Sequence, residues 1–465
     1  MTLLSIPLVS NAGARQPRQL NPDELQMDRQ TYRDLEVFET QGSAPTLFDL
    51  LNRTRTAGGA KVLRGRLRRP WSKISRIHSV QSALKHIIQH RAAFDLLPSD
   101  GTIANLEQYT HSGLPLIITE NRFEFVLEGA QVRFGDFKSY WLIMKGVERA
   151  AAFVRGLRRF VERPDLANVP GDLAPLVTEL RTLLDHPAFI VLPREGQGQL
   201  SWWQIIRIDR VLRYDHIDAI DRIVRLVFEL DALVAMADAT SYYDFVMPEA
   251  HDGLTEIDAR GLFHPFLDDP IPNDLCVNQE HRLMFLTGPN MAGKTTYLRA
   301  TGIAIYLAHV GMGVPAISFR FTPCDSLFTA ITLVDNVRKG VSFFRAEALR
   351  VKTIAAAVAN GRRVIALLDE PFMGTNVKDA LDASRVVLMG LASKRHSVFL
   401  VSSHLIELGD ALVETGAVQC FRFDANEDGG KLEFDYVLRP GISAQRLGVR
   451  VLREEGVFDL LARDS

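Results

Sequence analysis

The chain has 465 residues, of which 47% are hydrophobic and 24% charged, and its net charge is −2. This balance is typical of soluble globular proteins and allows two or three domains with a sizeable core. It excludes a general electrostatic attraction to nucleic acid or to membranes, so such binding would need a local basic patch. The three cysteines, Cys276, Cys324 and Cys420, lie far apart and have neither disulfide nor metal-site spacing. We therefore expect a cytoplasmic, reducing environment.

The first residues indicate a tail and not a targeting signal. Residues 1–22 are small, polar and rich in turn formers, which predicts disorder. Ala12-Gly13-Ala14 resembles a cleavage site, but no basic segment precedes the short apolar run, and Pro7 interrupts it. No stretch approaches the ~20 uninterrupted apolar residues of a membrane span, so we expect no membrane partner.

Residues 23–247 are expected to form a helical domain. The clearest helix lies between His216 and Ala239, where apolar residues recur at three- and four-residue steps. Proline ends a helix near Pro70, because it removes a backbone donor and restricts the residue before it. Loops rich in glycine and proline are expected near residue 165 and at Pro193–Gln199.

Residues 248–465 show a different pattern, in which short apolar runs alternate with helical stretches. The runs in "HRLMFLTG", "RRVIALLDE" and "HSVFLVSSH" each indicate a buried strand. Strands that alternate with helices are typical of an α/β domain with a largely parallel sheet. The predicted fold is therefore a helical domain followed by an α/β domain.

A phosphate-binding loop follows the first of these strands. Gly288 and Gly293-Lys294-Thr295 satisfy the pattern G-x-x-x-x-G-K-[ST] between a strand and a helix. Glycines let backbone amides approach a phosphate, and the helix that begins near Thr295 directs its positive end at the anion. Lys294 would meet the β- and γ-phosphates, and the Thr295 hydroxyl would bind Mg²⁺. The candidate ATP-binding residues are Gly288, Pro289, Asn290, Met291, Ala292, Gly293, Lys294, Thr295 and Thr296.

Three further candidates follow the other two strands. Asp369 ends one strand, where it can hold Mg²⁺ together with Thr295, and the adjacent Glu370 can polarise the attacking water. His404 follows the next strand, in position to sense the γ-phosphate. A histidine at a strand end is usually structural, but the neighbouring motifs here favour a role in the site.

These motifs resemble the ATPase domain of the MutS family, whose members act in DNA mismatch repair. The stretch "TGPNMAGKTTYLRATGIAIYLAHVGMGVPA" carries the family's Asn-Met pair inside the phosphate loop. The segments "DSLFTAITLVDNVRKGVSFFRAE", "LLDEPFMGTN" and "YVLRPGISAQRLGVRVLREEGV" also resemble it. Upstream, "LQMDRQTYRDLEVFET" resembles the start of the family's core, or lever, domain.

The resemblance implies a homodimer joined through ATPase domains, with composite ATP sites of the ABC type. One subunit would hold ATP and Mg²⁺, and Ser342 of the other would complete the site in trans. The implied function is an ATP-regulated switch that binds duplex or branched DNA in repair or recombination, with repair proteins as further partners.

The sequence also departs from the family pattern. Ala292, Ala330, Phe343 and Met373 replace the usual residues, which bears on the turnover rate and not on nucleotide binding. The chain opens almost directly at the core domain, so we expect no mismatch recognition by the family's Phe-x-Glu wedge. Phe160-Val161-Glu162 matches those letters but is expected in the core. We also expect a reduced or absent DNA clamp near Pro193 and a shortened C-terminal dimer lock.

A basic segment leaves two interpretations open. Residues 53–76 carry nine basic residues and no acid, and Lys61, Arg64 and Arg68 share one helical face. This face would bind DNA phosphates, or it would be a solvated helix face that packs its aliphatic stems on the ATPase domain; we favour packing. The alternative function, which a missing DNA clamp would permit, is an ATP-gated protein-interaction module without DNA binding. A transport ATPase is disfavoured because residues 335–347 lack Leu-Ser-Gly-Gly-Gln, and a chromosome-maintenance ATPase because long heptad arms are missing.

Overall fold

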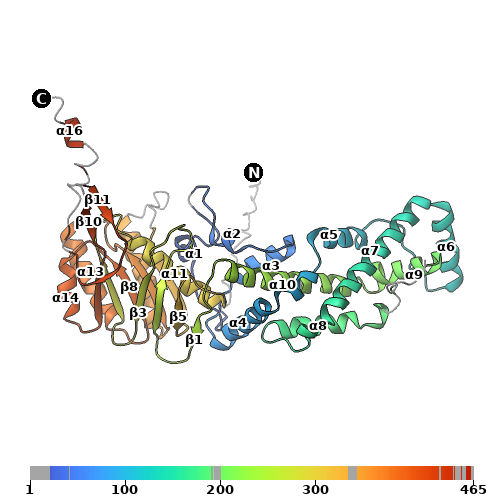
Figure 1. The fold of residues 1–465 in the computed structure, drawn as a ribbon, viewed down its shortest axis with the longest axis horizontal. Coiled ribbons are helices and arrows are strands. Elements are labelled where there is room, and N and C mark those ends of the chain that lie inside the picture. The colour runs from blue at the N-terminus through green and yellow to red at the C-terminus, as the bar shows by residue number, and fades with distance from the viewer. Residues whose placement is uncertain are drawn as a thin grey trace, which may run out of the picture.

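The computed structural model is elongated, with an α/β region at one end and a helical arm extending to the other (Figure 1). It describes residues 21–40, 42–189, 192, 200–332, 343–428, 431–443, 445, 452 and 457–461. Ser342, the turn at Pro193–Gln199 and all but the last two residues of the predicted tail lie outside these ranges. The predicted fold class, helices followed by an α/β region with a mostly parallel sheet, is confirmed.

The first half of the chain is helical. Its α-helices are α1 (Arg29–Asp34), α2 (Leu47–Leu51), α3 (Ala57–Leu67), α4 (Ile74–Gln89), α5 (Asp100–Thr110), α6 (Arg122–Gly135), α7 (Phe137–Val161), α8 (Leu173–Leu184), α9 (Trp202–Arg210) and α10 (Ile217–Tyr242). Short 3₁₀ turns are η1 (Arg91–Leu96), η2 (Pro164–Leu166) and η3 (Pro187–Phe189), and a π-helical turn, η4 (Val211–Asp215), joins α9 to α10. None of the helices in the described ranges has the length and apolar composition needed to cross a bilayer.

Helix α10 runs along the arm and packs against α3. Of the apolar positions that predicted it, Ile217 is half-buried and the others are buried: Ile220, Ile223, Val224, Val227, Leu230 and Val234. The two helices approach closely because α3 carries glycine at the contact; a Cβ on Gly59 would lie 2.1 Å from Oδ2 of Asp231. The buried Asp231 carboxylate in turn accepts hydrogen bonds from the amides of Arg55 and Thr56, just before α3. It thereby satisfies donors that a helix start leaves unpaired.

The second half of the chain forms the α/β region. Its strands are β1 (Glu249–Ala250), β2 (Ile257–Leu262), β3 (Asn273–Val277), β4 (Leu283–Thr287), β5 (Ser318–Phe321), β6 (Ser326–Ala330), β7 (Val364–Asp369), β8 (Val398–Ser402), β9 (Val418–Arg422), β10 (Ala425–Asp428), β11 (Lys431–Phe434) and β12 (Arg439–Pro440). Its helices are α11 (Lys294–Val310), α12 (Phe343–Ala359), α13 (Val377–Ala392), α14 (Glu407–Val413) and α16 (Val457–Leu461). The domain boundary between residues 247 and 248 stays a prediction; α10 ends at Tyr242 and β1 begins at Glu249.

The main sheet has the strand order β12-β9-β4-β8-β7-β6, and only β12 runs antiparallel to its neighbour. Strands β4, β7 and β8 are almost entirely apolar because both faces of the sheet are covered there. In β4, Met284 and Leu286 join the core shared with α11 and the arm, whereas Leu283 and Phe285 join the core beneath α12, α13 and α14. A second sheet has the order β1-β5-β2-β3, and β10 pairs with β11.

The strand order brings together the chain segments that follow β4, β7 and β8. Ser402 at the end of β8 pairs with Leu286 of β4 on one side and with Asp369 of β7 on the other. Because these strands are parallel, their carboxyl ends share one edge of the sheet. This edge is where ligands bind in open α/β sheets.

Candidate nucleotide-binding site

The turn between β4 and α11 has the backbone of a phosphate-binding loop. Gly288, Met291 and Gly293 adopt positive φ angles of 144°, 70° and 103°. A Cβ on Gly288 would lie 2.6 Å from the carbonyl oxygen of Phe423, so a side chain does not fit there. Met291 holds a left-handed conformation at a cost in backbone strain, which concentrates at functional sites. Helix α11 begins at Lys294, so its first unpaired amides face the turn.

Lys294 is held inside this loop. Its side chain is 5% exposed, and its Nζ atom donates hydrogen bonds to the carbonyl oxygens of Gly288 at 2.9 Å and Pro289 at 3.0 Å. The same Nζ lies 3.6 Å from Oε1 of Glu370. An ammonium with so little solvent is stabilised by acceptors and by opposite charge. The loop therefore presents a fixed positive charge, as a site for anionic phosphates requires.

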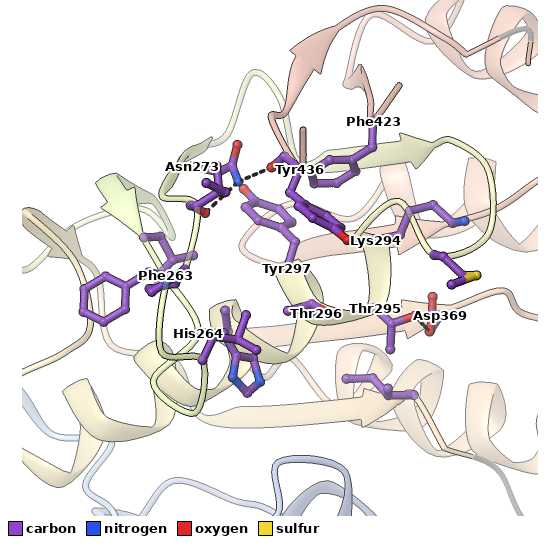
Figure 2. A pocket seen from close by; sticks show the side chains of 18 of the residues that line it. Phe263, His264, Asn273, Lys294, Thr295, Thr296, Tyr297, Asp369, Phe423 and Tyr436 are labelled. Carbon is purple, nitrogen blue, oxygen red and sulfur yellow. Dashed lines mark hydrogen bonds between the residues drawn. The ribbon is translucent and has the colours of Figure 1, made fainter. Parts of the chain in front are cut away.

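Oxygen ligands gather beside the lysine. The hydroxyl of Thr295 donates to Oδ2 of Asp369 at 2.6 Å, and Figure 2 shows these two side chains facing each other. Ser402 donates its hydroxyl hydrogen bond to Oδ1 of the same aspartate, which orients the carboxylate. Hydroxyl and carboxylate oxygens are the donors that Mg²⁺ prefers. These residues therefore fit a magnesium ion bound together with a nucleotide.

Glu370 lies between the side chains of Lys294 and His404. Its Oε2 atom is 3.5 Å from Nδ1 of His404, and its Oε1 atom faces Lys294. The hydrogen bond from His404 lowers the pKa of Glu370 below its ordinary value, although burial acts in the opposite direction. The hydrogen bond to Glu370 likewise raises the pKa of His404, against the effect of burial. Glu370 has a positive φ of 47°, a second point of strain in the site.

A pocket of about 950 Å³ extends from this loop to a wall formed by the segment that joins β2 to β3 and by the segment after β11. Tyr436 lies over the loop: its ring would be 3.2 Å from a Cβ on Gly293, and its carbonyl accepts a hydrogen bond from Asn273 at 2.9 Å (Figure 2). His264 also lines the pocket, where burial and then the charge of Arg299 lower its pKa to about 4. It is therefore neutral near pH 7. The volume and the mixed apolar and polar lining suit a nucleotide-sized ligand.

The structure brings most of the predicted site residues together. Asn290, Met291, Gly293, Lys294, Thr295, Thr296, Asp369 and Glu370 line this pocket. Gly288 and Pro289 contact Lys294 through their carbonyls, and His404 contacts Glu370. Ala292 is buried, whereas Ala330 and Met373 line the pocket and Phe343 begins α12. The role of Ser342 falls outside the described residues, and the roles of all these side chains stay predictions.

The basic face on α3 lies away from this pocket and has aromatic neighbours. The guanidinium carbon of Arg64 is 5.0 Å from the ring centre of Phe38 and 4.9 Å from that of Phe48. Arg68 lies 5.2 Å from the ring centre of Phe38, whereas Lys61 is exposed. These contacts favour packing, but on aromatic rings of the segment before α3 and not on the ATPase domain that the sequence led us to expect. A role in DNA binding stays a prediction.

The parallel sheet, the phosphate-binding loop and the acid pair define a P-loop nucleotide-hydrolysing domain, here joined to a helical arm. Residues 284–461 match the family model described as MutS domain V, and residues 30–112 match MutS domain III. The chain therefore belongs to the MutS family, and its domain V is an ABC-type ATPase domain. No match to a mismatch-recognition domain I was found.

Two relatives are named for mismatch repair. The DNA mismatch repair protein MutS of Persephonella marina (strain DSM 14350 / EX-H1) is 32% identical over 250 residues, which cover 53% of this chain and 28% of that protein. The DNA mismatch repair protein MutS of Aquifex pyrophilus is 28% identical over 263 residues, covering 55% of this chain and 30% of that protein. The aligned part is thus less than a third of the length of either relative.

Proposed function

We propose that this protein binds and hydrolyses ATP with Mg²⁺ and that the nucleotide regulates its binding to duplex or branched DNA in repair or recombination. The observation that carries the enzymatic part is the hydroxyl–carboxylate pair of Thr295 and Asp369, 2.6 Å apart, beside the buried Lys294. The DNA part is supported by similarity to the mismatch-repair proteins, over part of their length.

Each side chain then has a defined task. Bound Mg²⁺ neutralises negative charge on the β- and γ-phosphates. Thr295 and Asp369 hold this ion, and Lys294 binds the same phosphates as a fixed cation. Glu370 orients and polarises the attacking water, because its carboxylate lies next to the loop and stays ionised at neutral pH. His404 holds Glu370 and is placed to contact the γ-phosphate.

The active form in this proposal is a homodimer joined through the ATPase domains, as is typical for MutS domain V. Ser342 of each copy would reach the site of the other. The pocket is open at the phosphate-binding loop, where Met291 is 77% exposed, so a second copy has access to it. Sedimentation of the protein with and without ATP tests this point. A nucleotide-dependent dimer is expected, and a monomer under both conditions would contradict it.

The DNA part is tested by measuring binding to matched, mismatched and branched DNA, with and without ATP. We expect ATP to change the affinity, and the logarithm of the binding constant to fall linearly with the logarithm of salt concentration. The matched MutS domains are III and V, and on this basis we expect matched and mismatched duplexes to bind equally. A strong preference for the mismatch would overturn that expectation.

One observation favours an ATP-gated protein-interaction module as the second candidate. At the far end of the arm, Phe123 and Phe134 of α6 and Phe137 of α7 are 74%, 73% and 66% exposed (Figure 1). Apolar side chains gathered on a surface mark sites of protein association more often than sites of phosphate contact. ATP-dependent dimerisation without salt-dependent binding to any DNA in the same experiment would favour this candidate.

A further inference from the structure

The start of the helical region lies against strand β6, at the edge of the main sheet. The amide of Leu327 in β6 donates a hydrogen bond to the carbonyl of Gln26 at 3.0 Å. From α12, Arg350 donates to the carboxylate of Asp28 and, at 2.8 Å, to the carbonyl of Thr329 in β6. The segment that enters α1 is thus bound to two elements of the α/β region.

Asp34, the last residue of α1, makes a buried contact at this junction. Its side chain is 1% exposed, and its carboxylate accepts the Thr329 hydroxyl at 2.6 Å. It also accepts the backbone amides of Ile331 at 3.0 Å and Thr332 at 3.1 Å. Gln30 donates to the same carboxylate at 2.8 Å and to the Thr332 carbonyl at 2.7 Å. A carboxylate this far from water is tolerated only when hydrogen bonds satisfy it, as they do here.

The two backbone amides held by Asp34 belong to the nucleotide pocket. Ile331 and Thr332 line it together with Asp369 and Glu370. They directly follow β6, whose last residue Ala330 pairs with Leu368, the neighbour of Asp369. Asp34 itself does not line the pocket and therefore lies behind this wall.

We propose that Asp34 is a positioning residue of the nucleotide site: from the helical region, it fixes the pocket wall formed by Ile331 and Thr332 and so sets the affinity for nucleotide. The proposal rests on the ATP-binding function proposed above. If α1 moves away from β6, both wall amides lose their acceptor in a buried place. If bound nucleotide needs this wall, it shifts the equilibrium toward the state in which α1 is docked on β6. By thermodynamic linkage, docking of α1 raises the affinity for nucleotide by the same factor by which nucleotide favours docking.

The chain offers a matched control. Asp231 in α10 is also a buried carboxylate, 3% exposed, which accepts two backbone amides and a threonine hydroxyl at the start of α3. Asp34→Asn and Asp231→Asn each replace a carboxylate that accepts backbone hydrogen bonds by a carboxamide. The NH₂ group of the carboxamide is a donor and cannot accept hydrogen bonds from backbone N–H groups. Both variants are expected to lower the unfolding midpoint. Only Asp34→Asn is expected to weaken the binding of a fluorescent ATP analogue, by about tenfold.

The full chain is titrated with the analogue under conditions in which every variant is folded, and Lys294→Ala marks the loss of specific binding. Equal affinity of Asp34→Asn and the parent would overturn the proposal, as would an equal loss in Asp231→Asn. If Asp34→Asn does not fold, the milder variant Gln30→Ala tests the proposal. It is expected to bind the analogue about threefold more weakly than the parent, and an affinity equal to that of the parent would contradict the proposal. If the parent protein does not bind the analogue, the ATP-binding function itself is overturned. If the parent and the variants bind it with equal affinity, only the role of Asp34 is overturned.

Discussion

His404 and Glu370 contact each other beside the phosphate-binding loop, with Nδ1 of the histidine 3.5 Å from Oε2 of the glutamate. The other carboxylate oxygen of Glu370 lies 3.6 Å from Nζ of Lys294. Glu370 therefore engages the cation that we assign to phosphate binding. An arriving phosphate competes with Glu370 for Lys294, which links the position of the proposed water-activating group to nucleotide binding.

The stability of the protein should depend on pH through this pair. The raised pKa of His404 means that its contribution is complete below the ordinary histidine value of 6.5 and is lost as pH rises through the raised value. The lowered pKa of Glu370 means that its contribution is complete above the ordinary value of 4.5 and is lost as pH falls through the lowered value. The pair therefore stabilises most between these two ordinary values.

The measurement compares thermal unfolding of the parent and His404→Gln over a range of pH. The parent is expected to be the more stable by less than about 1 kcal/mol within this window, because both side chains are partly exposed, and to lose that advantage as pH rises through the raised pKa of His404. A difference that stays constant from mildly acidic to basic pH would show that His404 does not act through this ion pair.

Replacing Glu370 should separate binding from hydrolysis. Glu370→Gln keeps the shape of the side chain but removes the charge that polarises water, so the turnover rate should fall by about 100-fold or more. ATP affinity should be kept or increased, because the competitor of the phosphate for Lys294 becomes neutral. Single-turnover hydrolysis and equilibrium binding of ATP check the two effects. Parental turnover in this variant would remove Glu370 from its assigned role.

Replacing Asp369 should change the requirement for metal. Asp369→Asn keeps an oxygen near the Thr295 hydroxyl but loses the negative charge, so half-maximal hydrolysis should need about tenfold more Mg²⁺. The experiment titrates Mg²⁺ at saturating ATP. Ser402→Ala is the companion variant, since the Ser402 hydroxyl orients the Asp369 carboxylate through a hydrogen bond, and its effect should be in the same direction but smaller. An unchanged Mg²⁺ requirement in both variants would contradict a metal site at Asp369.

The phosphate end of the site could be predicted because its residues are close in sequence or follow buried strands. Gly288 to Thr296 form one loop and the first residues of α11, and Asp369 and His404 lie at the ends of apolar runs that parallel pairing brings together. Local pattern is enough for such a site. The other side of the pocket has no such signal, because Tyr436 and Asn273 meet only through folding, 163 residues apart in sequence.

The junction at α1 was missed for the same reason. Asp34 and Thr329 are 295 residues apart, and a single aspartate at a helix end has no sequence pattern that distinguishes it from a solvated one.

The basic face of α3 shows that a sequence pattern can place residues on one helix face without revealing what that face contacts. Spacing placed Lys61, Arg64 and Arg68 on one face, but whether that face was solvated or packed depended on Phe38 and Phe48, which precede the helix.

Two substitutions on α3 test whether this basic face is structural. Arg64→Ala should lower the free energy of unfolding by about 1 kcal/mol, because the guanidinium group lies over Phe38 and Phe48. Lys61→Ala, at an exposed position one turn earlier, should change it by less than about 0.5 kcal/mol. Urea unfolding measures the stability of both variants.

If the face instead binds DNA phosphates, both variants should weaken DNA binding and reduce its salt dependence, by about one counterion each. With the packing interpretation, both variants keep the salt dependence of the parent, and only Arg64→Ala is less stable.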